Sequence, residues 1–312
     1  MKPERSATAI GLLSVAIWAT NIGVLRTLIE ALGPFLYVAV SSGCGGVLLY
    51  GIEALRRRSA SRPFRVTRPY LLGGGLTFLL YVIPFCWSFS RVTREITIEL
   101  GLVNYLWPML ILVFSIPLLG HRARWRLFLP GIALGVGGVA LSMSEDFLPR
   151  AFFENVARNG AAFAAMFFSA ACWGVYSNLA KKYHKPGAPN GIALFQLAAA
   201  AVCGFLHAAT GEVSTWDRGI LLPLAYYIVF PTSLGYLFWE IGMKKGDLAL
   251  LGAASYFLPL GSMLFACRYL GVPLGWNLLA GAVLLVGGAV LSKKGIAERA
   301  AVPVESSGGP AA

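Results

Sequence analysis

The chain has 312 residues, of which 57% are hydrophobic and only 13% are charged, and its mean hydropathy is +0.69. Soluble domains usually carry about a quarter charged residues, so this composition excludes an ordinary soluble enzyme or binding domain. A net charge of +12 would suggest nucleic acid as the partner of a soluble protein, but in so apolar a chain the distribution of charge between loops matters more than its sum.

Ten apolar stretches follow one another from Ala7 to Ser292, and each is long enough to cross the hydrocarbon core of a bilayer. They predict ten transmembrane helices at about 7–28, 34–55, 70–90, 96–118, 126–144, 159–181, 190–210, 219–242, 248–269 and 275–292. The first stretch is interpreted as a retained helix because no small-residue cleavage site follows it. We therefore expect an all-α integral membrane protein without a soluble domain.

Basic residues are unevenly divided between the two sets of loops. If the amino terminus is cytoplasmic, the cytoplasmic segments hold 19 of the 26 Lys and Arg residues. Since cytoplasmic loops of membrane proteins are enriched in Lys and Arg, both termini are predicted to be cytoplasmic. The last residues, PVESSGGPAA, have the composition of a disordered tail, which we place at 295–312.

The chain repeats itself about residue 150. Four features recur in the same order, at separations of 150, 151, 155 and 152 residues: GGVALS and GGAVLS, NYLWP and SYFLP, SVAIW and SAACW, and the tryptophans Trp87 and Trp239. Five spans per half is an odd number, so the second half must enter the membrane from the opposite side. The sequence thus predicts two inverted five-helix repeats, at 1–148 and 149–294, with a substrate site near the midplane where they meet.

These features resemble the drug/metabolite transporter superfamily, in particular ten-helix exporters built from two EamA-type repeats. The resemblance covers about residues 7–293 and rests on the five-plus-five arrangement, Trp18 and Trp173, Pro108 and Pro259, and a glycine-rich last helix in each half. The stretch NYLWPMLILVFSIPLLGHRARW resembles YddG-type aromatic amino acid exporters of bacterial inner membranes. It implies a multi-pass inner-membrane secondary transporter that exports amino acids, aromatic ones first, and similar small amphipathic metabolites by alternating access.

Polar and aromatic residues inside the spans are the candidates for substrate binding, because buried polar groups in a bilayer need a partner or a wet cavity. They gather on the first, third and fourth helices of each half. The candidates are Trp18, Asn21, Tyr81, Trp87, Asn104, Tyr105, Trp107 and Pro108 in the first half, and Trp173, Tyr176, Tyr236, Trp239, Tyr256 and Pro259 in the second. Gln196 is a weaker candidate. A cavity walled by such rings suits a planar aromatic molecule or a cation.

Pro108 cannot donate a hydrogen bond to the carbonyl of Asn104, so we expect an interrupted helix there. Pro259 repeats the feature in the second half. The interruption could expose backbone to a substrate or could serve helix packing alone, and both interpretations stay open at this point. Likewise, the faces that carry Trp18 and Asn21, or Trp173 and Tyr176, could meet a cavity or a neighbouring helix.

Three other functions are weighed against amino acid export. The alternative within the class is an exporter of lipophilic cations or other drugs. A sugar-nucleotide carrier would need Arg or Lys deep in the spans, and none is convincingly there. An enzyme is not expected, since no metal-ligand spacing or nucleophile–base pair appears.

We accordingly expect no catalytic residue, cofactor, metal or nucleic acid. The expected partners are an amino acid and the lipid bilayer, and a monomer is compatible with the sequence. Five cysteines, none in a CxxC pair, are interpreted as packing residues. The glycines of the fifth and tenth helices predict that these two helices pack closely together.

Overall fold

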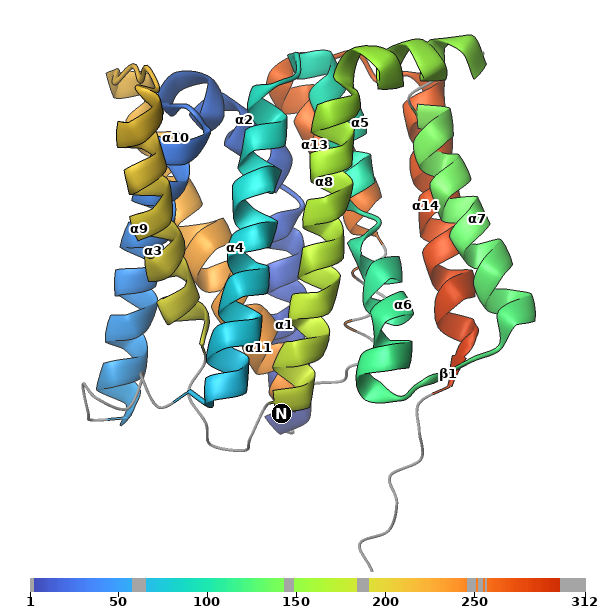
Figure 1. The fold of residues 1–312 in the computed structure, drawn as a ribbon, viewed down its shortest axis with the longest axis horizontal. Helices are drawn as coiled ribbons and strands as arrows, with labels where there is room; N and C mark the ends of the chain where they lie inside the picture. The colour runs from blue at the N-terminus through green and yellow to red at the C-terminus, as the bar shows by residue number, and fades with distance from the viewer. Residues whose placement is uncertain are drawn as a thin grey trace, which may run out of the picture.

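Long helices run side by side through the protein, whose structure is a computed structural model that describes residues 3–57, 66–142, 149–183, 191–245, 251, 255 and 257–297 (Figure 1). The first half contains α1 (Pro3–Trp18), α2 (Asn21–Leu32), α3 (Pro34–Arg57), α4 (Arg68–Ser90), α5 (Arg94–Asn104), α6 (Trp107–Leu119), β1 (Arg122–Ala123) and α7 (Trp125–Ser142). The second half contains α8 (Pro149–Tyr183), α9 (Ile192–Thr210), α10 (Arg218–Tyr227), the π-helix η3 (Ile228–Gly235), α11 (Tyr236–Lys245), α13 (Leu258–Leu270), α14 (Trp276–Lys294) and β2 (Ile296–Ala297).

The helices match the predicted membrane spans. Among the described residues, eight helical segments are long and apolar enough to cross a bilayer, and α1 with α2, bent by 46° at their break, makes a ninth. The remaining predicted span, 248–269, is represented by the shorter apolar helix α13, and most of the preceding part of that span lies outside the described residues. The prediction of an all-α multi-pass membrane protein is confirmed.

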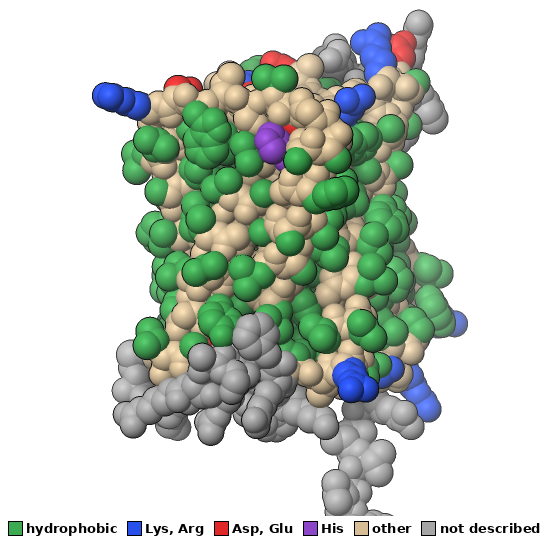
Figure 2. All heavy atoms as spheres, turned by 60° about the vertical axis from the view of Figure 1, so that its left-hand side comes forward, with side chains coloured by type: hydrophobic (Ala, Val, Ile, Leu, Met, Phe, Trp, Pro, Cys, Tyr) green, Lys and Arg blue, Asp and Glu red, His purple; other side chains and the backbone are tan. Residues whose placement is uncertain are grey.

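The outer surface has the polarity that a bilayer requires. Large apolar side chains such as Leu72, Phe205 and Leu222 are 71–79% exposed on it. Figure 2 shows hydrophobic side chains over the middle of the visible face and Lys and Arg side chains at its two ends. In Figure 1 the start of α1 and strand β1 lie at the same end, which we call the terminal face; the other end is the opposite face.

The two halves are interleaved rather than stacked as separate blocks. Helix α3 packs against α9, and α7 against α14, so the second and fifth spans of one half meet their own counterparts in the other. Helix α4 packs against α8, and α1 against α11. Exchanging the two halves turns the α4–α8 contact into the α11–α1 contact. This pattern is what two inverted five-helix repeats require.

Helices α7 and α14 approach each other through glycines, as predicted. A Cβ atom built on Gly138 would lie 2.5 Å from the carbonyl oxygen of Gly281, and one built on Gly288 would lie 2.5 Å from the carbonyl oxygen of Gly131. Only residues without side chains allow two helix backbones so close. The two helices form a scaffold at one side of the bundle (Figure 1).

A short antiparallel β-pair ties the two halves together on the terminal face. Arg122 pairs with Ala297 and Ala123 with Ile296, and the Arg124 amide donates to the carbonyl of Gly295 over 2.7 Å. Gly295–Ala297 were expected in the disordered tail at 295–312, but these hydrogen bonds hold them in place. The rest of that predicted tail lies outside the described residues.

Candidate functional site

Helices of both halves surround a cavity near the middle of the bundle. Counted with its opening to solvent, the empty space there is about 830 Å³. Of the fourteen residues predicted to bind substrate, eight line it: Trp18, Asn21, Tyr81, Asn104, Tyr105, Trp107, Trp173 and Tyr236. The tertiary structure thus brings together residues that lie up to 218 positions apart in the sequence.

Two helix breaks contribute to the wall of the cavity. Helix α1 ends at Trp18 and α2 begins at Asn21, so these residues flank the first break. Helix α5 ends at Asn104 and α6 begins at Trp107, which places Pro108 in the first turn of α6. Since Pro108 has no N–H group, the carbonyl of Asn104 loses its helical donor. The predicted interruption in this span is confirmed.

A third irregularity, the π-helix η3, was not predicted from the sequence. It contains Pro231, and side chains satisfy some of its carbonyl groups: Trp18 Nε1 donates to the Pro231 oxygen over 3.2 Å, and Gln196 Nε2 to the Thr232 oxygen over 2.9 Å. Such π-helical turns occur frequently at functional sites. These two hydrogen bonds join η3 to α1 and α9, and Pro231 and Thr232 also line the cavity.

Four rings from four helices form one side of the cavity, which we call the aromatic wall: Tyr81, Trp107, Trp173 and Tyr236. Trp173 is at its centre, with ring centroids 4.7 Å from Tyr81, 5.9 Å from Tyr236 and 6.5 Å from Trp107. These separations match the offset and edge-to-face contacts that aromatic rings prefer. The wall presents ring faces and edges from both halves of the chain.

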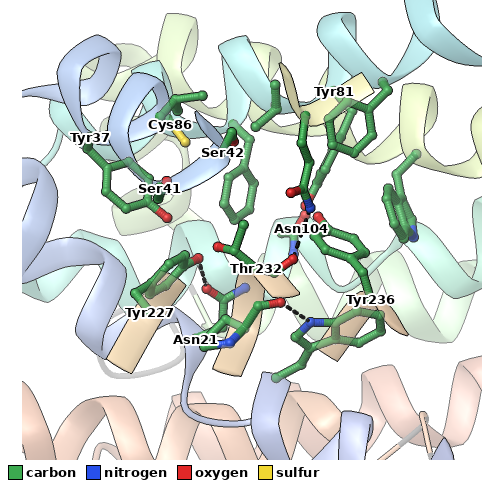
Figure 3. Close-up of a pocket in the computed structure, with 18 of the residues that line it drawn as sticks. Asn21, Tyr37, Ser41, Ser42, Tyr81, Cys86, Asn104, Tyr227, Thr232 and Tyr236 are labelled. Carbon is green, nitrogen blue, oxygen red and sulfur yellow. Dashed lines mark hydrogen bonds between the residues drawn. The ribbon is translucent and has the colours of Figure 1, made fainter. Parts of the chain in front are cut away.

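Uncharged polar residues form a second part of the lining, which we call the polar strip: Asn21, Ser41, Ser42, Gln196 and Thr232. Figure 3 shows Asn21, Ser41 and Ser42 on the side of the cavity away from Tyr81 and Tyr236, with Thr232 between them. The Tyr227 hydroxyl donates to Asn21 Oδ1. Tyr37 and Tyr227 lie beside Asn21 and Ser41, so rings also accompany the polar strip (Figure 3).

The sequence predicts no role for Ser41, Ser42, Tyr227 or Thr232, nor for Tyr37 and Cys86, which also line the cavity. A usable signal exists on α3, where Tyr37 and Ser41 are four residues apart in an otherwise apolar run and therefore share one helix face. Cys86 was interpreted as a packing residue. It is only 2% exposed and also lines the cavity.

The described residues that line the cavity include no Asp, Glu, Lys, Arg or His. A phosphate or a permanently charged drug would find no counter-charge there. The lining offers instead hydroxyl, amide and indole groups, which hydrogen-bond without adding a net charge.

Several predicted residues lie outside this cavity. Trp87 is half-buried near the opposite face, where the Arg91 guanidinium lies 5.6 Å from its ring. Trp239 packs behind the cavity against Trp18, with ring centroids 5.5 Å apart. Pro108 is buried and acts on the backbone rather than on the cavity.

The remaining predicted residues belong to the second half. Pro259 lines a separate, smaller space of about 170 Å³ together with Tyr105. Tyr176 contacts Trp173, with ring centroids 5.1 Å apart, but does not line the cavity itself. Tyr256 lies outside the described residues.

Tyr176 belongs to a four-ring cluster between the cavity and the terminal face, which we call the aromatic plug: Tyr70, Phe78, Tyr176 and Phe195. The ring centroids are 5.3 Å apart for Tyr70 and Phe195, 5.7 Å for Phe78 and Tyr176, and 6.1 Å for Tyr176 and Phe195. Tyr70 lies in the first turn of α4 and Phe195 in the first turn of α9, at the ends of these helices near the terminal face (Figure 1). The plug joins α4, α8 and α9.

The repeat relates the aromatic plug to residues on the other side of the cavity. Tyr176 follows Trp173 by three residues as Asn21 follows Trp18, and Phe195 is the fourth residue of α9 as Tyr37 is of α3. Asn21 and Tyr37 line the cavity, whereas Tyr176 and Phe195 pack ring against ring outside it. The two halves therefore do not surround the cavity in the same way.

A multi-pass helical bundle with inverted halves and an uncharged cavity between them defines the class of the protein as a small-molecule membrane transporter. The EamA-like transporter family matches residues 5–144 and 160–293, one copy in each half. The chain belongs to this family, and it is a transporter rather than an enzyme.

Relatives of the chain carry a more specific name. The aromatic amino acid exporter YddG of Salmonella typhimurium is 29% identical over 92% of this chain and 97% of its own length. The proteins of the same name from Escherichia coli and Ancylobacter novellus are 28% and 31% identical, again over 92% of this chain and over 97% and 96% of their own lengths. A solved crystal structure with 26% sequence identity aligns with a TM-score of 0.71, over 93% of this chain and 98% of its own.

Proposed function

We propose that this protein exports aromatic amino acids, and similar small amphipathic metabolites, across a bacterial cytoplasmic membrane as a secondary carrier. The observation that carries the proposal is the cavity, whose lining combines the four rings of the aromatic wall with the uncharged polar strip. Planar side chains pack well against such rings, and the absence of charged groups among the described lining residues disfavours phosphorylated substrates. The name shared by the relatives supports the same substrate class.

The substrate contacts in this proposal come from the eight predicted residues that line the cavity, together with the polar strip. Tyr176 and Trp239 support Trp173 and Trp18 from behind. Pro108 acts by releasing the Asn104 carbonyl, and Pro259 is proposed to do the same for its own span. Trp87, near the opposite face, is assigned to interfacial anchoring.

Transport by alternating access follows from the difference between the two halves. In this proposal the aromatic plug closes the path from the cavity to the terminal face, while the equivalent residues Asn21 and Tyr37 line the cavity. If the halves exchange conformations, Tyr176 and Phe195 separate, and Asn21 and Tyr37 close the other path. The carrier then exposes the same cavity to each side of the membrane in turn.

We further propose that the terminal face is cytoplasmic, with both termini inside, because most Lys and Arg residues of the sequence belong to its loops. The repeats are assigned to 1–148 and 149–294. A monomer suffices, because the cavity is formed by helices of one chain.

Counterflow in liposomes tests the function. Purified protein is reconstituted with unlabelled tryptophan inside, and uptake of labelled tryptophan is measured against protein-free liposomes. We expect exchange by the wild type, strong loss with Trp173→Ala, and little change with Trp125→Ala. Trp125 is the matched control because it is 56% exposed and does not line the cavity. Exchange of a lipophilic cation such as tetraphenylphosphonium without exchange of tryptophan would contradict the proposal.

A further inference from the structure

We propose that the polar strip binds the ammonium and carboxylate groups of a zwitterionic substrate, so that the carrier selects against analogues that carry only one of the two charges. This inference rests on the proposed function and adds the part of the substrate that the aromatic wall does not explain. It follows from the donors, the acceptors and the charge of the cavity lining.

Asn21 supplies donors for the carboxylate. Its Oδ1 atom already accepts a hydrogen bond from the Tyr227 hydroxyl, so the Nδ2 group is the part of the amide left to donate. Asn21 is also the first residue of α2, whose first N–H groups have no acceptor within the helix. The twelve-residue helix directs the positive end of its dipole to the same place. An anionic group next to Asn21 would receive hydrogen bonds from both sources.

Gln196 supplies an acceptor for the ammonium group. The residue is only 1% exposed, and its Nε2 group is held by the Thr232 carbonyl at 2.9 Å. Its Oε1 atom is itself buried and has no hydrogen-bond partner among the described residues. A buried acceptor without a donor lowers stability, and a donor from a ligand removes that cost. This is an independent sign that the strip is built to meet a polar ligand.

The charge of the lining sets the selectivity. With no Asp, Glu, Lys, Arg or His among the described lining residues, a ligand with one net charge leaves water without gaining a counter-charge. A zwitterion carries its own counter-charge, and Asn21 and Gln196 can each hydrogen-bond one of its groups. The cavity therefore favours zwitterions, which carry two opposite charges and no net charge.

The arrangement also fits the shape of an aromatic amino acid. Figure 3 places Asn21, Ser41 and Ser42 across the cavity from Tyr81 and Tyr236. A planar side chain against the aromatic wall would direct the α-carbon toward the polar strip. The aromatic wall then binds the ring of the substrate, and the polar strip binds its charged groups.

Competition in the counterflow assay tests this selectivity. Unlabelled tryptophan, the cation tryptamine and the anion indole-3-propionate share the indole ring and differ in their charged groups. For the wild type we expect tryptophan to compete at least about tenfold better than either analogue, since each analogue lacks one of the two charged groups and the hydrogen bonds made to it. Equal competition by the three ligands would overturn the inference while leaving tryptophan transport intact. Failure of the wild type to exchange tryptophan would overturn the proposed function and this inference together.

Variants assign the two groups. Asn21→Leu should lower competition by tryptophan and leave tryptamine nearly unchanged, whereas Gln196→Met should lower competition by tryptophan and leave indole-3-propionate nearly unchanged. Gln196→Glu adds a negative charge and should shift the preference toward tryptamine. Ser115→Ala is the matched control, because Ser115 is buried, bonds within its own helix and does not line the cavity. If the first three variants weaken all three ligands in equal proportion, the strip does not recognise the charged groups and the inference fails.

Discussion

Replacing Gly138 with alanine tests the scaffold formed by α7 and α14. The new Cβ would lie 2.5 Å from the Gly281 carbonyl oxygen and 2.8 Å from the Leu285 nitrogen. The first contact is about 0.9 Å short of the 3.4 Å at which ordinary van der Waals contact begins. Both neighbours are backbone atoms of α14, so the whole helix has to shift, and overpacking of this kind costs about 1–3 kcal/mol.

Gly137→Ala is a matched control on the same helix, because a Cβ built on Gly137 has no atom within 4 Å. Alanine improves the helix propensity by up to about 1 kcal/mol at both positions. This gain cancels when the two variants are compared, so Gly138→Ala should be less stable than Gly137→Ala by about 1–3 kcal/mol.

Thermal unfolding of the purified variants in detergent, followed by loss of monodisperse protein, measures the difference. We expect Gly137→Ala to match or exceed the wild-type midpoint and Gly138→Ala to fall below it. The inverted repeat predicts the same contrast in the second half, where a Cβ on Gly281 meets the Gly138 oxygen at 2.5 Å and one on Gly287 meets nothing within 4 Å. Equal midpoints for the two members of either pair would refute the close backbone contact.

Three further predictions concern the cavity. Gly45→Ala should reduce tryptophan exchange several-fold, because its Cβ would lie 2.6 Å from the Thr232 methyl carbon and 3.0 Å from Gln196 Oε1; Gly43→Ala, whose nearest contact is 3.5 Å, should not. Tyr227→Phe leaves Asn21 Oδ1 without its donor and should cost about 1–3 kcal/mol in the free energy of unfolding; an unchanged midpoint would contradict this hydrogen bond. In a protein with Cys86 as its sole cysteine, Phe195→Ala should speed labelling of Cys86 by an impermeant thiol reagent from the terminal face; an unchanged rate would argue against the aromatic plug as the barrier.

Only one of the three helix interruptions could be predicted from the local sequence. Pro108 predicted the break between α5 and α6, because a missing N–H group acts on its own helix wherever that helix lies. The break between Trp18 and Asn21 and the π-helix at Pro231 were not predicted. Their stability depends on partners distant in sequence, such as the Trp18 indole, which donates to the Pro231 carbonyl 213 residues away.

The residues that line the cavity were likewise predicted only in part from the sequence. Trp18, Asn104 and Trp173 stand out because they are rare in apolar spans, and the structure places them at the cavity. Serine is common in membrane helices, where it can bond to its own backbone, so Ser41 and Ser42 carried little signal. Trp87 and Pro259 share the residue types of the site without lining it.

By itself the sequence determined the membrane class, the spans and the inverted repeat. Each span must be long enough to cross the hydrocarbon core and nearly free of charge, and these requirements act on each segment independently. It also determined the close packing of α7 and α14, since glycines leave few alternatives at a helix contact. Only the tertiary structure decided which aromatic residues share the cavity, that Ser41, Ser42 and Gln196 complete it, and that Tyr176 and Phe195 form the plug. The physical reason is that rotation of each helix about its axis is set by its neighbours, and that rotation decides whether a side chain faces lipid, another helix or the cavity.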